Sequence, residues 1–204
     1  MAKNKSKFIE DRPQGVVYSK INISLNDIHS YRILYGVLLS FFRANNWKDD
    51  FSPVSIQIVD NLPLLSFVPA FLQLWTLCRY CELTQIKIQD IKKSHDITIS
   101  SSKSDHTRVM PKISPVDPVQ LQTIKDKTKV SVVSYDSYKN SIKEVKAQLG
   151  LSFDESILDC THIFRHLEAS FLFNRGVSVP DISYKLGHIL DKTTLEYIHK
   201  DWKF

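Results

Sequence analysis

The sequence predicts a mainly helical (α+β) fold with one small antiparallel β-sheet, and three observations lead to that class. Apolar residues recur at helical spacing through most of the chain, one pair of short segments predicts two strands, and no internal repeat or linker divides the chain. With 204 residues, 43% of them hydrophobic, the chain can bury one good core. We therefore expect a basic arm over residues 1–20 and a single domain over residues 21–204.

The first part of this domain contains two expected helices and one segment that the pattern leaves open. Residues 24–27 resemble a capping box and precede apolar residues at helical spacing. Residues 53–59 alternate weakly, as a strand or an irregular connection would. Pro69 lies where a first-turn proline would, so we expect a strongly apolar helix to begin there and to contain Arg79 and Glu82.

Turn residues mark a hairpin and the helices that follow it. Residues 96–100 and 107–110 predict two strands, with polar residues at the tip between them. A short helix is expected after Pro118. A longer helix begins at Ser134 and ends at Gly150, a residue suited to a left-handed C-cap.

Three more helices are expected in the last quarter of the chain. Thr161 is the expected cap of the first, and Pro180 opens the second, which ends near Gly187. Residues 193–196 form a capping box for a last helix that carries Tyr197. The total of about seven or eight helices against one hairpin supports the mainly helical class.

The charge of the chain favours a polyanionic partner. The net charge is +5, and basic residues concentrate in two stretches: Lys92, Lys93, Lys103, Arg108 and Lys112, then Lys125, Lys127, Lys129, Lys139, Lys143 and Lys146. A basic balance of this kind is typical of proteins that bind nucleic acid. A solvated charged face accounts for the same pattern, so charge alone leaves both interpretations open.

The sequence also bears on location. It contains no uncharged apolar run of about 18 residues, so no transmembrane helix is expected. The basic N-terminus leads into charged residues, unlike a secretory signal. Three cysteines fit a reducing compartment better than a disulfide framework. These observations favour a cytoplasmic protein.

The last quarter of the chain contains an unusual set of histidines, an arginine and a tyrosine. His162 and Arg165 lie three residues apart and hence on one face of a helix. His188 follows an expected helix end, and Tyr197 comes nine residues later. Arg79 lies far upstream in an apolar segment, where a charge is costly unless it is paired or used.

Two interpretations of Arg79 remain open at this point. It can form a structural ion pair with Glu82, three residues later, or it can act in binding and catalysis. Glu82 itself is expected to be structural and to hold a neighbouring arginine or a backbone amide.

Three ordered motifs resemble those of the tyrosine recombinase (phage integrase) family. They are Leu77-Cys-Arg79-Tyr-Cys-Glu82-Leu83, then His162-Ile-Phe-Arg165-His166 with Ala169, Ser170, Leu172 and Gly176, and finally Leu186-Gly187-His188 with Thr194 and Tyr197. Lys103 lies in the predicted hairpin, where the family carries a lysine in a β-turn. The resemblance extends from about residue 24 to residue 199 and implies the helical catalytic domain of that family.

The resemblance implies a role for each catalytic residue. Arg79 and Arg165 would bind the non-bridging oxygens of a DNA phosphate, with His188 as a further donor, and so stabilise the transition state. The nucleophile would be Tyr197, a phenol whose ordinary pKa is about 10, so a base is needed. His162 is the expected base, and Lys103 would protonate the departing 5′ oxygen. No metal or other cofactor is required.

The implied function is site-specific DNA recombination through a 3′-phosphotyrosine, for integration, excision or inversion of a mobile element. The expected partner is double-stranded DNA, with a dimer or tetramer on DNA and mainly a monomer off it. Two alternatives remain, a type IB-like topoisomerase and a catalytically silent DNA-binding regulator. Most members of the family carry a core-binding domain before the catalytic one, whereas short recombinases that resemble the fimbrial phase-switch enzymes lack it. We expect that half of the DNA clamp to be missing here, whether by truncation or by nature.

A zinc site is a further alternative. Cys78 and Cys81 have C-x-x-C spacing, and Cys160 with His162 would complete a set of three cysteines and one histidine. The pair falls inside an expected apolar helix, however, where cysteines act as small hydrophobic residues. We therefore expect no metal.

Overall fold

A computed structural model describes residues 25–47, 49–93, 95–101, 107–115, 117–152 and 161–204. The basic arm expected over residues 1–20 and the candidate catalytic residue Lys103 lie outside the described residues. The helices and strands are, in chain order, α1 (Leu25–Ala44), α2 (Pro53–Asn61), α3 (Leu64–Thr76), the 3-10 helix η2 (Tyr80–Gln85), α4 (Ile88–Lys92), β1 (Ile97–Ser100), β2 (Thr107–Met110), α5 (Pro118–Gln122), α6 (Tyr135–Gln148), α7 (Ile163–Asn174), α8 (Val179–Leu186) and α9 (Asp191–Leu195).

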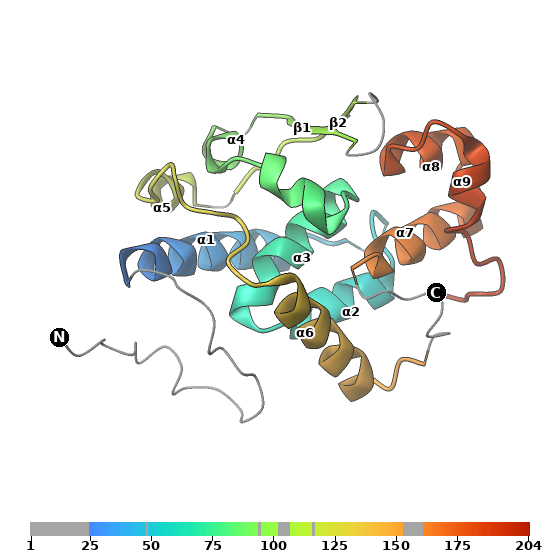
Figure 1. Cartoon of the computed structure of the whole chain (residues 1–204), viewed down its shortest axis with the longest axis horizontal. Coiled ribbons are helices and arrows are strands. Elements are labelled where there is room, and N and C mark those ends of the chain that lie inside the picture. Colours follow the sequence, from blue (N-terminus) through green and yellow to red (C-terminus); the bar gives the residue numbers. More distant parts are fainter. Residues whose placement is uncertain (1–24, 48, 94, 102–106, 116, 153–160) are drawn as a thin grey trace.

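The described elements confirm a mainly helical fold with a small antiparallel sheet. Strands β1 and β2 pair with Ile97 opposite Met110 and Ser100 opposite Thr107. Helix α3 runs through the middle of the domain, with α1 and α5 towards one end and α7, α8 and α9 at the other (Figure 1). The strand hairpin lies along one edge of the molecule (Figure 1).

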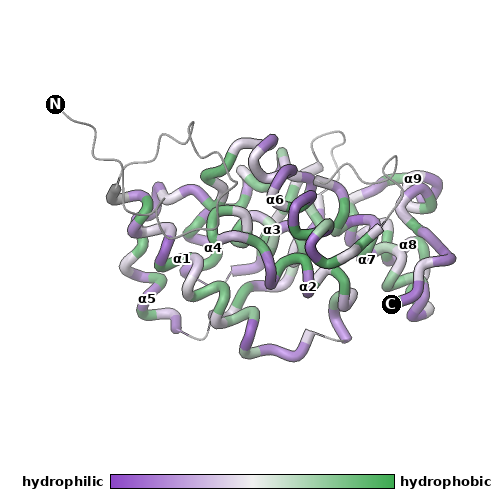
Figure 2. Tube along the Cα trace, turned by 90° about the horizontal axis from the view of Figure 1, so that it is seen from below, coloured by the Kyte–Doolittle hydropathy of each residue, from purple (hydrophilic) through white to green (hydrophobic). Residues whose placement is uncertain are grey.

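The core is built around α3. Every residue of this helix except Leu64 and Trp75 is buried. Phe67 and Phe71 pack edge-to-face against Phe42 of α1, with ring centroids 5.8 and 5.9 Å apart. Hydrophilic stretches lie mainly along the rim of the chain trace, while hydrophobic stretches run through its middle (Figure 2). The end of α3 is therefore a rigid point from which the next residues can be positioned.

The segment of residues 53–59, expected as a strand or an irregular connection, is helix α2 instead. The hydroxyl of Ser52 accepts a hydrogen bond from the Ser55 N–H at 3.1 Å, and Pro53 occupies the first turn. Ser55, Ile58 and Val59 form the buried face at helical spacing. The expectation was wrong because the capping signal outweighs the weak alternation.

Helix α3 begins five residues before its expected start, so Pro69 lies inside the helix. A proline cannot donate to the carbonyl four residues earlier, which belongs to Leu65. The buried hydroxyl of Tyr31 in α1 donates to that carbonyl at 3.1 Å, and it lies 3.5 Å from the Val130 carbonyl. A tertiary hydrogen bond thus replaces the missing local one, which a sequence pattern does not reveal.

This arrangement predicts a coupling between Tyr31 and Pro69. Tyr31→Phe leaves the Leu65 carbonyl buried without a donor and should destabilise the domain by about 1–3 kcal/mol. Pro69→Ala restores a backbone N–H that can satisfy that carbonyl, so in this background the loss of the Tyr31 hydroxyl should cost about 1 kcal/mol less. Urea unfolding of the four proteins measures the cycle. Strictly additive effects would show that Tyr31 does not compensate for the proline.

The other predicted elements are mostly confirmed. The hairpin, α6 and the left-handed Gly150 at φ +66° lie where they were expected. Ser178 caps α8, which has Pro180 in its first turn. Thr161 is not the cap of α7: its hydroxyl lies 3.3 Å from the Tyr135 hydroxyl, and His162 precedes the helix instead. Within the described ranges, no helix is both long and apolar enough to span a membrane.

A buried carboxylate connects α7 to the start of α2. Both oxygens of Glu168 accept from the Ser52 N–H at 3.1 Å, and the side chain is 1% exposed. Burial raises the pKa of Glu168 to about 7, although hydrogen bonds from Ser55 and Ser52 and the charge of Lys185 act in the opposite direction. The folded state therefore holds a proton that the unfolded chain releases at lower pH.

The sign of this linkage predicts a pH effect on stability. Between the ordinary carboxyl pKa of about 4.5 and the raised value of about 7 the folded state binds more protons, so stability falls as pH rises through that window. Glu168→Gln, which has no such proton to lose, should gain up to about 3 kcal/mol relative to wild type by pH 8. Thermal unfolding of both proteins from pH 4.5 to 8 measures the difference. A difference that does not change with pH would contradict the raised pKa.

Candidate active site

The candidate site begins at the turn that ends α3. The helix stops at Thr76, and Leu77 adopts a left-handed conformation with φ 49°. Such a conformation is uncommon for a residue other than glycine and marks a position held by its surroundings. We expected Arg79 and Glu82 to lie in the apolar helix. This prediction was wrong, because the chain turns before it reaches them. Arg79 is the N-cap of η2.

Glu82 holds two arginines. Its carboxylate accepts from the Arg79 backbone N–H at 2.8 Å and from the Arg79 guanidinium at 2.9 Å. It also pairs with Arg108 at 3.3 Å, where both side chains are fully buried. The expectation that Glu82 is structural is confirmed. The predicted ion pair between Arg79 and Glu82 is present. Arg79 also lies near Arg165 and His188, so a catalytic role stays open for this arginine.

Arg165 and His188 form the centre of the site. The Nη2 atom of Arg165 lies 2.7 Å from Nε2 of His188, and Nη1 of Arg165 donates to the Leu77 carbonyl. Burial lowers the pKa of Arg165 to about 10; Tyr197 raises it, and the charges of Arg79 and Arg108 lower it further. An excess of positive charge is therefore concentrated around one carboxylate.

Tyr197 faces the positive charge of Arg165. Its hydroxyl lies 3.3 Å from Nδ1 of His162, and the Arg165 guanidinium carbon is 5.2 Å from the centre of the Tyr197 ring. The ring stacks on His166 with centroids 4.4 Å apart. Burial and the charges of His199, His162 and Arg165 lower the pKa of His166 to about 3.

Tyr197 does not lie in a helix, contrary to the prediction. Helix α9 spans Asp191–Leu195, so the tyrosine follows its end. Thr193, the expected cap, lies inside this helix and donates its backbone N–H to Leu190. The Thr194 hydroxyl bonds to His188 at 2.9 Å rather than capping anything. Tertiary hydrogen bonding thus displaces the local capping box.

Four of the predicted residues are brought together in one cluster: His162, Arg165, His188 and Tyr197. Arg79 lies close enough to lower the pKa of both Arg165 and His188. Lys103 is outside the described residues, so its expected role as a general acid stays a prediction.

Arg108 is a member of this site that the sequence interpretation did not include. It is fully buried, and its Nη1 atom has no hydrogen-bond partner among the described residues. A signal was present: strand alternation places Arg108 opposite Ile99, on the inward face of the hairpin. A charge at an inward strand position indicates a buried partner.

Gly187 leaves the space that Arg108 occupies. A Cβ atom at position 187 would lie 2.3 Å from Nη1 of Arg108, and the residue has φ +69°. Both the backbone conformation and the close approach therefore require glycine here. The glycine of the Leu186-Gly187-His188 motif packs directly against the guanidinium that Glu82 holds.

Substitutions at Gly187 and Gly150 separate the cost of the backbone conformation from the cost of the close contact with Arg108. Gly187→Ala and Gly150→Ala share the strain of a positive φ, about 1–2 kcal/mol, but position 150 has nothing within 4 Å of an added Cβ. We expect Gly187→Ala to destabilise the domain by more than Gly150→Ala in urea unfolding, because Arg108 must move. Arg108→Ala should make Gly187→Ala as mild as the control. Equal effects of the two substitutions in the wild-type background would contradict the contact.

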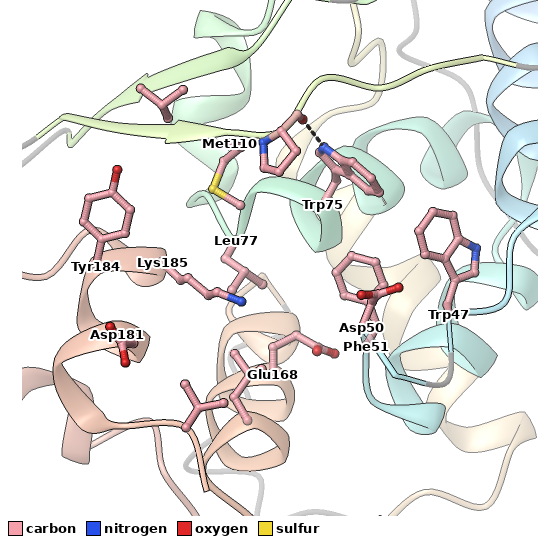
Figure 3. A pocket seen from close by; sticks show the side chains of 14 residues that line it. Trp47, Asp50, Phe51, Trp75, Leu77, Met110, Glu168, Asp181, Tyr184 and Lys185 are labelled. Carbon is pink, nitrogen blue, oxygen red and sulfur yellow. Dashed lines mark hydrogen bonds between the residues drawn. The ribbon is translucent and has the colours of Figure 1, made fainter. Parts of the chain in front are cut away.

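A cavity of about 540 Å³ lies beside the cluster and is lined by residues such as Trp75, Leu77, Glu168, Tyr184 and Lys185. Glu168 and Lys185 point into it from α7 and α8 (Figure 3). None of the five candidate residues that the structure describes lines this cavity. Leu77 is the connection, because it lines the cavity while its carbonyl binds Arg165. The candidate site is therefore distinct from the cavity.

The cysteines do not form the expected helical pair. Cys78 and Cys81 follow α3, and Cys78 is buried while Cys81 is exposed. Burial raises the pKa of Cys78 to about 12, as for a cysteine that packs as a small hydrophobic residue. Among the described residues no group of three potential metal ligands is present, and Cys160 lies outside them.

No protein-family model and no curated protein matches the sequence. Solved structures match the fold. XerA recombinase is 18% identical with a TM-score of 0.53, over 72% of this chain and 57% of its own. The catalytic domain of bacteriophage HP1 integrase is 19% identical with a TM-score of 0.50, over 72% of this chain and 84% of its own. A lambda integrase dimer bound to a COC′ core site is 18% identical with a TM-score of 0.51, over 76% of this chain and 49% of its own.

The chain thus has the fold of a tyrosine recombinase catalytic domain, which confirms at the level of fold what the three motifs implied. It spans 57% of the XerA recombinase chain and 49% of the lambda integrase chain. At 18% and 19% identity this likeness concerns the fold, and the activity is argued from the side chains.

Proposed function

We propose that this chain is the catalytic part of a site-specific DNA recombinase that cleaves and rejoins DNA through a 3′-phosphotyrosine. The observation that carries the proposal is the cluster itself. A phenol hydroxyl lies 3.3 Å from a ring nitrogen of His162, and the same tyrosine ring faces the guanidinium of Arg165. The proposed base and anion-binding group, three residues apart at the start of α7, meet the proposed nucleophile, which follows α9.

The electrostatics of the cluster favour an anionic substrate. The groups that shift the pKa of Arg165 include two other arginines but only one carboxylate, that of Glu82. A phosphodiester brings the missing negative charge, and its pentacoordinate transition state carries more. Preorganised charged donors stabilise that extra charge most strongly where water is excluded.

The proposed reaction uses the clustered residues together with Lys103, which lies outside the described residues. His162 takes the proton of the Tyr197 hydroxyl as the phenol oxygen attacks phosphorus. Arg79 and Arg165 bind the non-bridging oxygens, with His188 beside them, and the 5′ oxygen leaves with a proton from Lys103. Attack by a second 5′-hydroxyl on the phosphotyrosine reverses the step, so strands are exchanged without hydrolysis.

The proposed partner is double-stranded DNA, with integration, excision or inversion of a mobile element as the outcome. The basic stretches supply phosphate contacts, which make binding dependent on salt. Lambda integrase, whose fold this chain shares, is a dimer on its core site. We propose a dimer or tetramer on DNA and mainly a monomer off it.

The proposal predicts the behaviour of two tyrosine variants. Tyr197→Phe should abolish covalent adducts with nicked suicide substrates made from the DNA flanking the gene, because no nucleophile remains. Tyr184→Phe is the matched control, since Tyr184 is exposed on α8 and lies outside the cluster. Denaturing gels measure the adduct, and DNA binding of both variants should stay close to wild type.

The outcomes separate the alternatives. Adducts that persist in Tyr197→Phe would overturn the assignment of the nucleophile. Wild-type protein that binds DNA but forms no adduct is a silent regulator. Relaxation of supercoiled DNA by a monomer, without exchange between paired sites, identifies a topoisomerase.

A further inference from the structure

We propose that Asp191, acting through Ser183 and Thr194, fixes the tautomer of His188 so that its Nε2 lone pair holds Arg165 in place. These three residues are positioning residues, because they act on the reaction only through His188. The effect on cleavage rests on the proposed function, whereas the tautomer itself does not.

A continuous chain of hydrogen bonds joins the residues. Oδ1 of Asp191 lies 2.8 Å from Oγ of Ser183, and Oγ of Ser183 lies 2.5 Å from Oγ1 of Thr194. Oγ1 of Thr194 lies 2.9 Å from Nδ1 of His188, whose Nε2 is 2.7 Å from Arg165. Ser183, Thr194 and His188 are buried, while Asp191 is exposed at the end of the chain of bonds.

The direction of these bonds follows from counting protons. A carboxylate only accepts, so the single hydroxyl proton of Ser183 points to Asp191. The Ser183 oxygen must then accept from Thr194, which uses the single proton of that hydroxyl. The Thr194 oxygen can therefore only accept, and Nδ1 of His188 must carry the donated proton.

The other end of the chain requires the same tautomer. A guanidinium only donates, so Nε2 of His188 must accept from Arg165. Arg165 thus has two acceptors on different elements, the Leu77 carbonyl and His188. With two fixed acceptors the plane of the guanidinium is set before a phosphate arrives, which is the condition for preorganised binding.

The chain of hydrogen bonds from Asp191 through Ser183 and Thr194 to His188, called the relay below, also suits the later protonation of His188. Burial lowers the pKa of His188 to about 3, and the charges of Arg165, Arg79 and Arg108 add to this, so the ring is neutral without DNA. When a phosphate takes up the donors of Arg165, His188 donates to it only after gaining a proton at Nε2. Nδ1 is the donor in both forms, so the contact with Thr194 is kept.

The tautomer can be observed directly. In protein labelled with ¹⁵N-histidine and free of DNA, the two ring nitrogens of His188 should have the shifts of an Nδ1–H tautomer, with Nε2 unprotonated. His188→Gln assigns the signal among the seven histidines. An Nε2–H tautomer in the wild-type protein would overturn the proposal.

Two variants break the relay at different points. Ser183→Ala frees the Thr194 hydroxyl, which can then donate to Nδ1, so His188 should become a mixture of tautomers. Asp191→Asn replaces an obligatory acceptor by an amide that can donate, and should shift His188 in the same direction. Asp181→Asn is the matched control: this exposed acid in α8 also binds a serine, Ser178, but lies outside the relay. A wild-type tautomer in both relay variants would refute the relay.

Cleavage provides the second measurement. We expect Ser183→Ala and Asp191→Asn to slow adduct formation about 10- to 100-fold, by analogy with the loss of a partner that orients a metal-ligating histidine. Asp181→Asn should retain the wild-type rate. If wild-type protein forms no adduct, the proposed function fails while the tautomer result stands. If adducts form at unchanged rates in both relay variants, only the relay's role in cleavage fails.

Discussion

The rest of the candidate site depends on the buried carboxylate of Glu82. Arg108 is fully buried and Arg79 is partly exposed, and the buried carboxylate of Glu82 supplies an acceptor to both. Through Arg108 the same carboxylate connects the strand hairpin to the turn after α3, and Gly187 packs against that guanidinium. One buried anion therefore ties together three segments of the chain that carry candidate catalytic residues.

Positive charge remains in excess after this pairing. Within the described part of the chain, Arg165 is held by the Leu77 carbonyl and by His188 rather than by a carboxylate. Dipoles orient a cation without cancelling its charge, so the guanidinium stays available to an anion. A fold that balanced this charge with a second carboxylate would be better neutralised and worse at binding a phosphate. The site thus gives up some electrostatic stability for affinity towards its proposed substrate.

Backbone turns place the side chains as much as helices do. Leu77 and Gly187 both have left-handed backbone conformations, and each ends a helix just before a candidate catalytic residue, Arg79 or His188. Tyr197 likewise follows the end of α9 rather than lying within it. A helix end frees the next residues to turn inward, so the reacting groups converge on one point from separate directions.

The sequence by itself determined the helical class, the hairpin, and the identity and order of the candidate catalytic residues, because periodicity, caps and motifs are local. Where these local patterns competed with hydrogen-bond partners distant in the chain, they predicted the wrong structure. The start of α3 depends on the hydrogen bond from the Tyr31 hydroxyl to the Leu65 carbonyl. The position of Tyr197 depends on the hydrogen bond between Thr194 and His188. The burial of Arg108 depends on Glu82, 26 residues away in the chain. Only the tertiary structure decides which buried polar groups meet, since each must find a partner wherever the chain brings one within reach.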